Sequence, residues 1–272
     1  KLHFMFTRKL FFSHRDFDWI IDKAEKGEKF ALYTGRGPSN NVHMGHIVPW
    51  IMCKWLQEKF DVELYFQMTD DEKFLYDPDL TLDQTNGYAY DNALDVIALG
   101  FDPKKTHIFV DTDYAKTMYR IAIKIAKLTT FSTAKAVFGF DNSTNVGMPF
   151  YTSMQAATCF LPSVIHGKKI PVLIPAAIDQ DPYWRITRDV ADRLGYYKPA
   201  AIHNTFLPSL QGPDGKMSAS IPDSAIFTTD SPEAARKKIM KSFSGGAATL
   251  KEQKEKGGNP NVDTACQYMF YM

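Results

Sequence analysis

The chain has 272 residues, of which 44% are hydrophobic and 23% charged, with 32 basic and 31 acidic side chains. This apolar fraction, combined with a formal net charge of +1, excludes an intrinsically disordered chain. The balance also argues against binding of nucleic acid through uniformly high positive charge, but it leaves a local basic patch open. We expect a globular protein with one large domain, or one domain and part of a second.

The number and spacing of the cysteines and the hydropathy of the chain indicate in which cellular compartment the protein works. Cys53, Cys159 and Cys266 are far apart and form no C-x-x-C pair, which removes the usual zinc spacings. An odd number of thiols is typical of a reducing environment. No apolar run approaches the roughly 18 residues of a membrane helix. We therefore expect a cytoplasmic protein with no structural metal and no membrane contact. Because the chain begins at Lys1 rather than Met, we also expect trimming at both ends.

Short apolar runs alternate with longer helical patterns, which indicates strand–helix–strand units and a parallel sheet. The predicted strands are residues 30–34, 62–69, 107–110, 171–176 and 201–204. The predicted helices between them are residues 43–60, 81–99 and 182–194. Residues 114–167 interrupt the alternation with helices alone, so we interpret them as an insertion. Helical material resumes from Ser231.

The predicted fold is α/β, a Rossmann-like doubly wound parallel sheet with a helical insertion and the start of an α-helical C-terminal domain. We divide the chain into an N-terminal segment, a main domain with its insertion, and a helical part, at residues 1–29, 30–230 (insertion about 114–167) and 231–272. Charge is uneven: residues 61–102 carry 11 acidic residues and one basic, whereas residues 231–272 carry seven basic and four acidic. Each run is typical of a solvated helix face.

A first phosphate-binding signal is the string His43-Met-Gly-His46, which follows a predicted strand and opens a helix. Free N–H groups and the positive dipole end favour an anion at such a helix start. His43 and His46 share one helix face, and each ring can donate a hydrogen bond to a phosphate oxygen. Gly45 would let a flat ring such as adenine lie against the backbone. Alone, the string could equally be a pair of surface histidines.

A second signal is Lys216-Met-Ser-Ala-Ser220, in a loop rich in Gly and Pro after the last predicted strand. Open parallel sheets place ligand-binding loops there. Lys216 supplies a compact charge for phosphate, and neighbouring hydroxyls add donors. An ordinary exposed loop is the alternative for this string taken alone. The two strings in this order, on these elements, favour a nucleotide site.

Together the strings resemble the HIGH and KMSKS signatures of class I aminoacyl-tRNA synthetases, with Ala219 replacing the second lysine. Further strings are similar to tryptophanyl-tRNA synthetases of eukaryotes and archaea: YTGRGPS at 33–39, QMTDDEK at 67–73, QAA at 155–157 and AIDQDPY at 177–183. The resemblance extends from about Leu10 to the end of the chain. It implies activation of L-tryptophan with ATP to tryptophanyl-adenylate, followed by transfer to tRNA(Trp).

The resemblance also implies roles for individual residues. Implied catalytic residues, around the phosphates of ATP, are His43, His46, Lys216 and Ser218. Further implied ATP contacts are Arg36, Gly45, Lys73, Gln180 and Met217. A slot for the indole ring would be lined by Tyr33, Gln67, Glu72, Gln155 and Gln180, with Tyr33 and Gln180 nearest the indole nitrogen. Mg²⁺ would arrive with the polyphosphate rather than on dedicated protein ligands.

Partners and alternatives complete the prediction. The resemblance implies a homodimer formed through the insertion, and an anticodon-binding domain that continues beyond Met272. A tyrosyl-tRNA synthetase is the nearest alternative, although the strings at 33–39 and 67–73 favour tryptophan. A small nucleotidyltransferase shares H-x-G-H but not the KMSAS loop. A non-catalytic synthetase-derived interaction or signalling protein is the third alternative, and it would have no reason to keep His43, His46 and Lys216.

Overall fold

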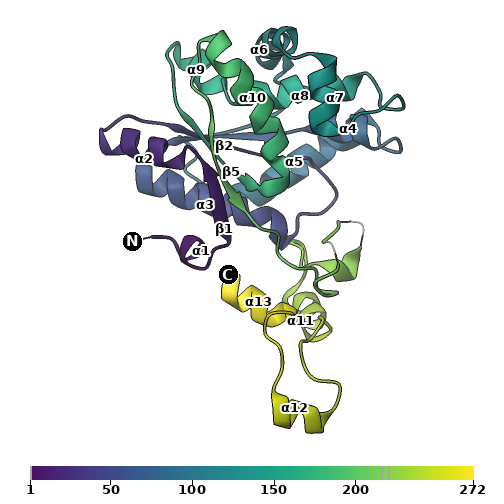
Figure 1. Cartoon of the computed structure of the whole chain (residues 1–272). Coiled ribbons are helices and arrows are strands. Elements are labelled where there is room, and N and C mark those ends of the chain that lie inside the picture. Colours follow the sequence, from purple (N-terminus) through teal and green to yellow (C-terminus); the bar gives the residue numbers. More distant parts are fainter. Residues whose placement is uncertain (1, 216, 220) are drawn as a thin grey trace. The chain divides into compact units, whose positions relative to one another are not determined.

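The structure is a computed structural model that describes residues 2–215, 217–219 and 221–272. Its strands form one sheet in the order β1-β6-β5-β2-β3-β4 (Figure 1). The strands are β1 (Phe11–Arg15), β2 (Ala31–Arg36), β3 (Glu63–Met68), β4 (Thr106–Val110), β5 (Val172–Ala177) and β6 (Ala200–Asn204). β2 runs parallel to both β3 and β5, and the pairs β3–β4 and β5–β6 are parallel as well.

The chain divides into two compact units. The larger unit comprises Phe12–Ser39 and Pro49–Asn204, and the smaller comprises Lys1–Phe11, Asn40–Val48 and Thr205–Met272. Helices of the larger unit are α2 (Phe17–Glu25), α4 (Asp70–Tyr76), α5 (Leu82–Ala98), α6 (Ala115–Leu128), α7 (Phe131–Phe138), α8 (Gly147–Thr158), α9 (Leu161–His166), the 3₁₀ turn η1 (Ile178–Gln180) and α10 (Asp181–Leu194). Those of the smaller unit are α1 (Phe4–Thr7), the 3₁₀ turn η2 (Pro222–Ser224), α11 (Pro232–Met240), α12 (Leu250–Lys256) and α13 (Thr264–Tyr271). α3 (Met44–Phe60) begins in the smaller unit and continues in the larger.

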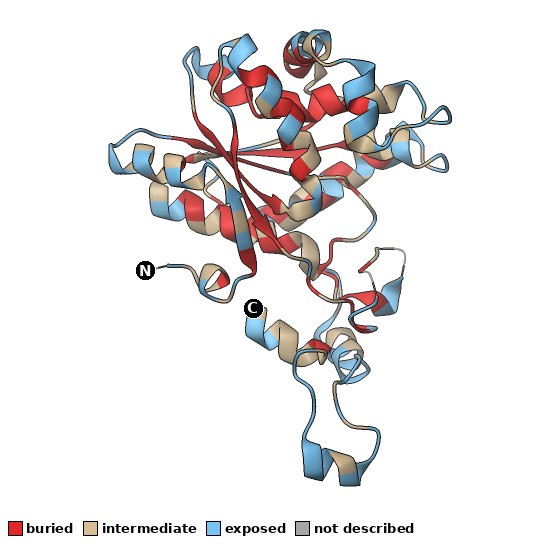
Figure 2. Ribbon diagram, in the orientation of Figure 1, coloured by how far each residue is buried: buried red, intermediate tan, exposed pale blue. Residues whose placement is uncertain are grey.

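Helices cover both faces of the sheet within the larger unit (Figure 1). One face packs against α6, α8 and α10 in a continuous buried cluster that includes Tyr33, Ile121 and Tyr151. On the other face, the Trp50 ring of α3 lies 5.2 Å from the Phe66 ring of β3. Burial therefore concentrates along the strands (Figure 2). A sheet buried on both sides explains why its strands are apolar runs rather than alternating patterns.

The strand order creates a switch point between β2 and β5. The chain leaves β2 towards β3 and β4, and later returns to place β5 on the other side of β2. Loops that follow β2 and β5 diverge there, which is where open α/β sheets bind ligands. The backbones also approach closely, because a Cβ atom on Gly35 would lie 3.0 Å from the carbonyl oxygen of Gln67. Glycine at the end of β2 thus keeps this edge of the sheet compact.

The five predicted strands and the helical insertion, α6 to α9, are confirmed. The end of α10 is confirmed too, with Gly195 in the left-handed conformation at a φ of 79°. The sequence analysis missed α1, β1, α2 and α4. β1 escaped detection because it is an edge strand with alternating burial, in a stretch that mixes Phe with basic residues. Residues 1–29 therefore contribute a strand to the sheet.

Candidate functional site

A chain of polar side chains crosses the apolar core at the carboxyl ends of β2 and β3. The Tyr33 hydroxyl donates to Gln67 Oε1 at 2.5 Å and lies 3.3 Å from the carbonyl oxygen of Gln155. Gln67 Nε2 in turn donates to both carboxyl oxygens of Asp111, at 2.9 and 2.7 Å. Tyr33 is 2% exposed, and Gln67 and Asp111 are fully buried. Burial raises the pKa of Tyr33 well above its ordinary value, so the phenol stays protonated.

Two further glutamines lie at the same end of the sheet. Gln155 Nε2 of α8 donates to Gln180 Oε1 in η1, directly after β5, at 3.3 Å. Gln155 Oε1 is buried and accepts no hydrogen bond from the residues that the structure describes. The Trp184 ring packs edge-on against Tyr33, with centroids 5.4 Å apart. Four of the five residues predicted for the indole slot thus form two hydrogen-bonded pairs, joined through Tyr33 and Gln155.

Glu72, the fifth residue predicted for the slot, lies on α4. Its Oε2 accepts from Thr69 Oγ1 at 2.8 Å, and its Oε1 lies 3.5 Å from the Tyr183 hydroxyl. Burial raises the pKa of Glu72, while the hydroxyl donors and the charge of Lys73 act against that rise. The arrangement offers a buried, hydroxyl-supported carboxylate to a cationic group.

The histidine string lies in the smaller unit. His43 forms an isolated bridge with Phe227, and α3 begins one residue later, at Met44. The rings of His43 and His46 stack with centroids 3.5 Å apart. His46 Nδ1 accepts from the His43 backbone N–H at 3.2 Å, so a neutral His46 carries its proton on Nε2 as a donor. The predicted pairing of the two rings is present, although His43 stands just outside the helix.

The two signature strings meet within the smaller unit. A Cβ atom on Gly45 would lie 3.2 Å from Met217 Sδ and 3.1 Å from the His43 ring, so glycine keeps the strings in contact. Ser218 donates its backbone N–H to Ser224 Oγ at 3.0 Å. Lys216, the predicted cation of this loop, lies outside the described residues.

Arg36 and Lys73, both expected to contact ATP, have neighbours in the larger unit. Arg36 donates to Ser39 Oγ at 2.6 Å and to Asn92 Oδ1 at 3.3 Å. Burial lowers the pKa of Arg36 to about 10, which still leaves it charged at neutral pH. Lys73 Nζ lies 3.4 Å from Asp77 one turn further along α4. The sequence predicted neither set of neighbours, because they come from packing and helix register.

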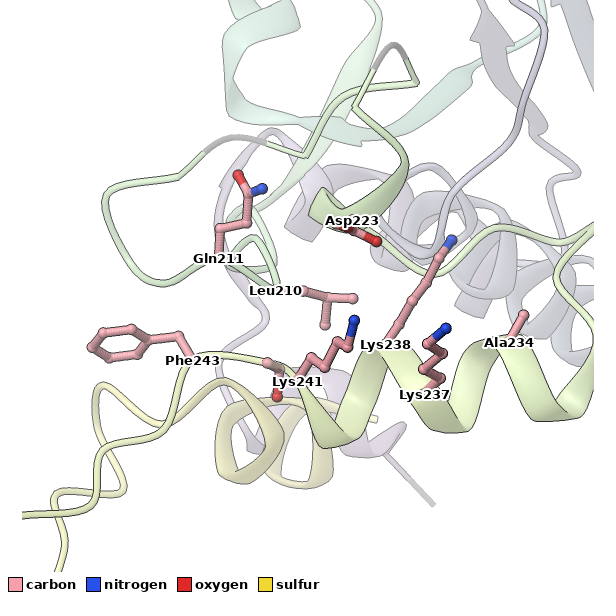
Figure 3. A pocket seen from close by; sticks show the side chains of 9 residues that line it. Leu210, Gln211, Asp223, Ala234, Lys237, Lys238, Lys241 and Phe243 are labelled. Atoms are coloured by element: carbon pink, nitrogen blue, oxygen red, sulfur yellow. The ribbon is translucent and has the colours of Figure 1, made fainter.

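A second feature of the smaller unit is a pocket of about 640 Å³ (Figure 3). It is lined by Leu210, Gln211, Asp223, Ala234, Lys237, Lys238, Lys241, Ser242 and Phe243. The three lysines extend from the same side of α11 (Figure 3). Lys238 is neutralised by Asp230, at 2.6 Å, and lies over the Phe227 ring. In the part of the chain that the structure describes, Lys237 and Lys241 make no ion pair, so the pocket keeps a positive charge.

Three general features concern membrane helices, metal-binding groups and cysteines. Across residues 2–215, 217–219 and 221–272, no helix is long and apolar enough to cross a membrane. The same residues contain no group of three or more His, Cys, Asp or Glu side chains that could hold a metal ion. Cys53 and Cys159 are buried, Cys266 is partly exposed, and all three are free thiols.

The sequence and the structure of the chain are similar to those of known proteins of one family. Residues 25–269 match the model of the tRNA synthetases class I (W and Y). The tryptophan–tRNA ligase of Sulfolobus acidocaldarius is 54% identical over 274 residues, covering 100% of this chain and 70% of that protein. The tryptophan–tRNA ligase of Pyrococcus furiosus is 57% identical over 261 residues, covering 96% of this chain and 66% of that protein. The crystal structure of Plasmodium falciparum tryptophanyl-tRNA synthetase has a TM-score of 0.92 at 42% identity, covering 100% of this chain and 74% of that chain.

Proposed function

Because the chain belongs to the class I tRNA synthetases of the tryptophan and tyrosine family, we propose that it activates L-tryptophan with ATP and transfers the tryptophanyl group to tRNA(Trp). The observation that carries the amino-acid assignment is the polar chain from Gln155 through Tyr33 to Gln67, set in an aromatic wall. An indole needs a flat apolar slot with an acceptor for its single N–H. A buried polar group that the wrong amino acid would leave unpaired discriminates better than size alone.

The activation step asks the protein for positioning and charge stabilisation. The tryptophan carboxylate is already ionised at neutral pH, so it attacks the α-phosphorus of ATP without a general base. One carboxylate-oxygen-to-phosphorus bond forms as the bond to the bridging oxygen breaks, and pyrophosphate leaves with Mg²⁺. We assign amino-acid recognition to the larger unit, and phosphate recognition to His43, His46 and Lys216 in the smaller. Donors fixed in advance towards the developing charge supply the rate enhancement.

Tryptophan-dependent ATP–pyrophosphate exchange tests this function, with tyrosine assayed in parallel. We expect exchange with tryptophan, and a loss of about a hundred- to a thousand-fold in Lys216→Ala, the cost of removing one preorganised donor. Lys251→Ala on α12 is the matched control, because it removes one exposed lysine far along the chain from both strings. Preference for tyrosine would support the tyrosyl alternative. Wild-type exchange in Lys216→Ala would contradict the assignment, and no exchange by the wild type would favour a non-catalytic protein.

The tRNA partner is supported by the lysine-lined pocket of α11. Backbone phosphates dominate affinity for nucleic acids, and Lys237 and Lys241 present two ammonium groups one helical turn apart. We propose that residues 231–272 begin the tRNA-binding domain and that these lysines contact the phosphate backbone. The chain spans about 70% of the length of the Sulfolobus relative. We further propose a cytoplasmic location, in agreement with the three free thiols.

A homodimer through the insertion is the remaining proposal. Tyr119 and Ile123 of α6 and Phe131 of α7 are 54%, 42% and 59% exposed. Exposed large apolar side chains from adjoining helices are typical of protein interfaces. Light scattering should give about twice the 30.9 kDa of one chain. A Phe131→Asp variant should shift the equilibrium towards the monomer, whereas a wild type of one-chain mass at micromolar concentration would refute the dimer.

A further inference from the structure

Asp111 is a buried carboxyl group that neither the sequence motifs nor the family strings single out. It follows the last residue of β4, is fully buried, and receives Gln67 Nε2 on both of its oxygens at 2.9 and 2.7 Å. Its backbone N–H donates to the Met68 carbonyl at 3.0 Å, so the main chain is held independently of the side chain. The carboxyl group of Asp111 is therefore linked to Tyr33 through Gln67.

The hydrogen bonds from Asp111 to Tyr33 have a fixed direction. A primary amide has donors only on nitrogen and an acceptor only on oxygen. With Gln67 Nε2 committed to Asp111, Gln67 Oε1 is turned to Tyr33 and accepts the hydroxyl proton at 2.5 Å. A phenol has one proton, so the Tyr33 oxygen can then only accept from a ligand. Reversing the Gln67 amide would use a lone pair of the Tyr33 oxygen and release its proton to the Gln155 carbonyl, 3.3 Å away, or to the ligand.

We propose that Asp111 is a positioning residue that sets the polarity of the slot, so that Tyr33 presents an acceptor to a ligand N–H. The proposal rests on the tryptophan activity proposed above. Burial and the neighbouring Asp71 carboxyl group raise the pKa of Asp111.

Asp111→Asn tests the proposal, because asparagine matches aspartate in shape but can donate to Gln67 Oε1 and reverse the amide. Exchange kinetics would be measured with tryptophan and with β-(3-benzothienyl)alanine, in which sulfur replaces the indole N–H. We expect the variant to raise KM for tryptophan at least tenfold and to change kcat/KM for the sulfur analogue less than threefold. Asp113→Asn, exposed and bonded to the Tyr90 hydroxyl, is the matched control and should leave both substrates unchanged.

A second variant separates polarity from packing. Asp111→Asn combined with Gln67→Glu exchanges the amide and the carboxyl group between the two positions, so the side chain introduced in place of Gln67 again accepts from Tyr33. We expect this double variant to regain at least a third of the wild-type preference for tryptophan over the sulfur analogue. Equal loss on both substrates in Asp111→Asn, or no recovery in a double variant that folds by thermal melting, would overturn the role of Asp111. A wild type without tryptophan-dependent exchange would instead overturn the proposed function.

Discussion

Glu72 shows how one side chain can bring a charge to the proposed indole slot, whose other polar groups are uncharged. Its carboxylate is supported by Thr69 Oγ1 at 2.8 Å and faces the Tyr183 hydroxyl. Burial raises the pKa of Glu72, and the hydroxyl hydrogen bonds, which favour the ionised form, oppose that rise. An amino acid brings an α-ammonium group that needs such a partner. Among the residues around the slot, Glu72 combines burial with a negative charge and hydroxyl donors.

Replacing Glu72 by glutamine should therefore weaken tryptophan binding while preserving the fold. The substitution keeps the shape and the bond from Thr69 but removes the charge, and a hydrogen bond to a charged group is worth about 1.5–3 kcal/mol. We expect KM for tryptophan to rise roughly ten- to a hundred-fold, with KM for ATP nearly unchanged. Exchange assays at varied tryptophan and at varied ATP would measure this. Equal increases in both KM values would mean that Glu72 does not select the amino acid.

At the residue scale, the sequence predicted which side chains on or after the strands would form the site. It did not predict the side chains that hydrogen-bond to them. Gln67 lies near the end of β3 and Gln180 shortly after β5, as predicted, whereas β2 continues to Arg36 and so places Tyr33 inside the strand. Asp111 follows the end of β4, but no sequence motif singles it out. The bonds of Arg36 to Asn92 depend on how α5 packs, which no local pattern encodes.

At the element scale, β1 is tied to the start of α10 by an ion pair. Arg15 Nε and Nη2 donate to the two oxygens of Asp181, at 2.6 and 2.7 Å. Asp181 is 4% exposed and also binds Arg185. The hydrogen bond from Arg15 lowers the pKa of Asp181 to about 2. A fork-to-fork pair of this kind fixes both the distance and the orientation of the two elements.

Arg15→Met should destabilise the larger unit by leaving the Asp181 carboxylate short of partners. Removing one member of a fully buried pair costs about 3–5 kcal/mol, and we expect about 2 kcal/mol here because the Arg15 side chain is 36% exposed. Urea unfolding followed by circular dichroism would measure the loss. Arg8→Met, on the same N-terminal stretch but without an ion pair among the described residues, is the control. A loss below about 0.5 kcal/mol would show that β1 is held by its backbone alone.

Elements with strong local signals were predictable, and those defined by tertiary contact were not. The core strands are recognisable in the sequence as apolar runs. Helix α5 has a Thr81 N-cap that forms a capping box with Gln84, and Gly100 follows its C-terminal end. α4 is too short for a periodic pattern, and β1 depends on β6 beside it. Arg15 of β1 pairs with Asp181, which is 166 residues away in the sequence, so no local sequence pattern could have predicted the pair.

At the scale of the whole molecule, the distribution of charge matters more than the net +1. The acidic stretch of residues 61–102 was interpreted as a solvated face, and that interpretation is wrong for Asp70. Asp70 is fully buried, and Asp71 and Glu72 are half-buried. The sequence shows a run of carboxylates but not which of them face inward, because short helices such as α4 have no clear periodicity.

These carboxyl groups should make the free energy of unfolding depend on pH. Burial raises the pKa of Asp71 to about 6, above its ordinary 3.8, so the folded state binds a proton that the unfolded state has lost. That contribution is present at low pH and disappears as the pH rises from about 4 through 6. Asp181 has the opposite sign, but its pKa of about 2 confines its effect to pH below about 4. The pKa of Asp111 is raised as well, so between pH 4.5 and 7.5 Asp71 and Asp111 outweigh Asp181 in the pH dependence of the free energy of unfolding.

Asp71→Asn should remove this pH-dependent loss of stability. The free energy of unfolding of the variant should therefore increase relative to that of the wild type as the pH rises. A difference of about two pKa units corresponds to a relative gain on the order of 2–3 kcal/mol at pH 7.5 over pH 4.5. Urea unfolding at the two pH values would measure it, with Asp113→Asn as the exposed control. A gain of the same size at both values would assign the effect to packing rather than to the proton. A wild type whose stability rises across the range, with no change in the variant, would place the shared proton elsewhere.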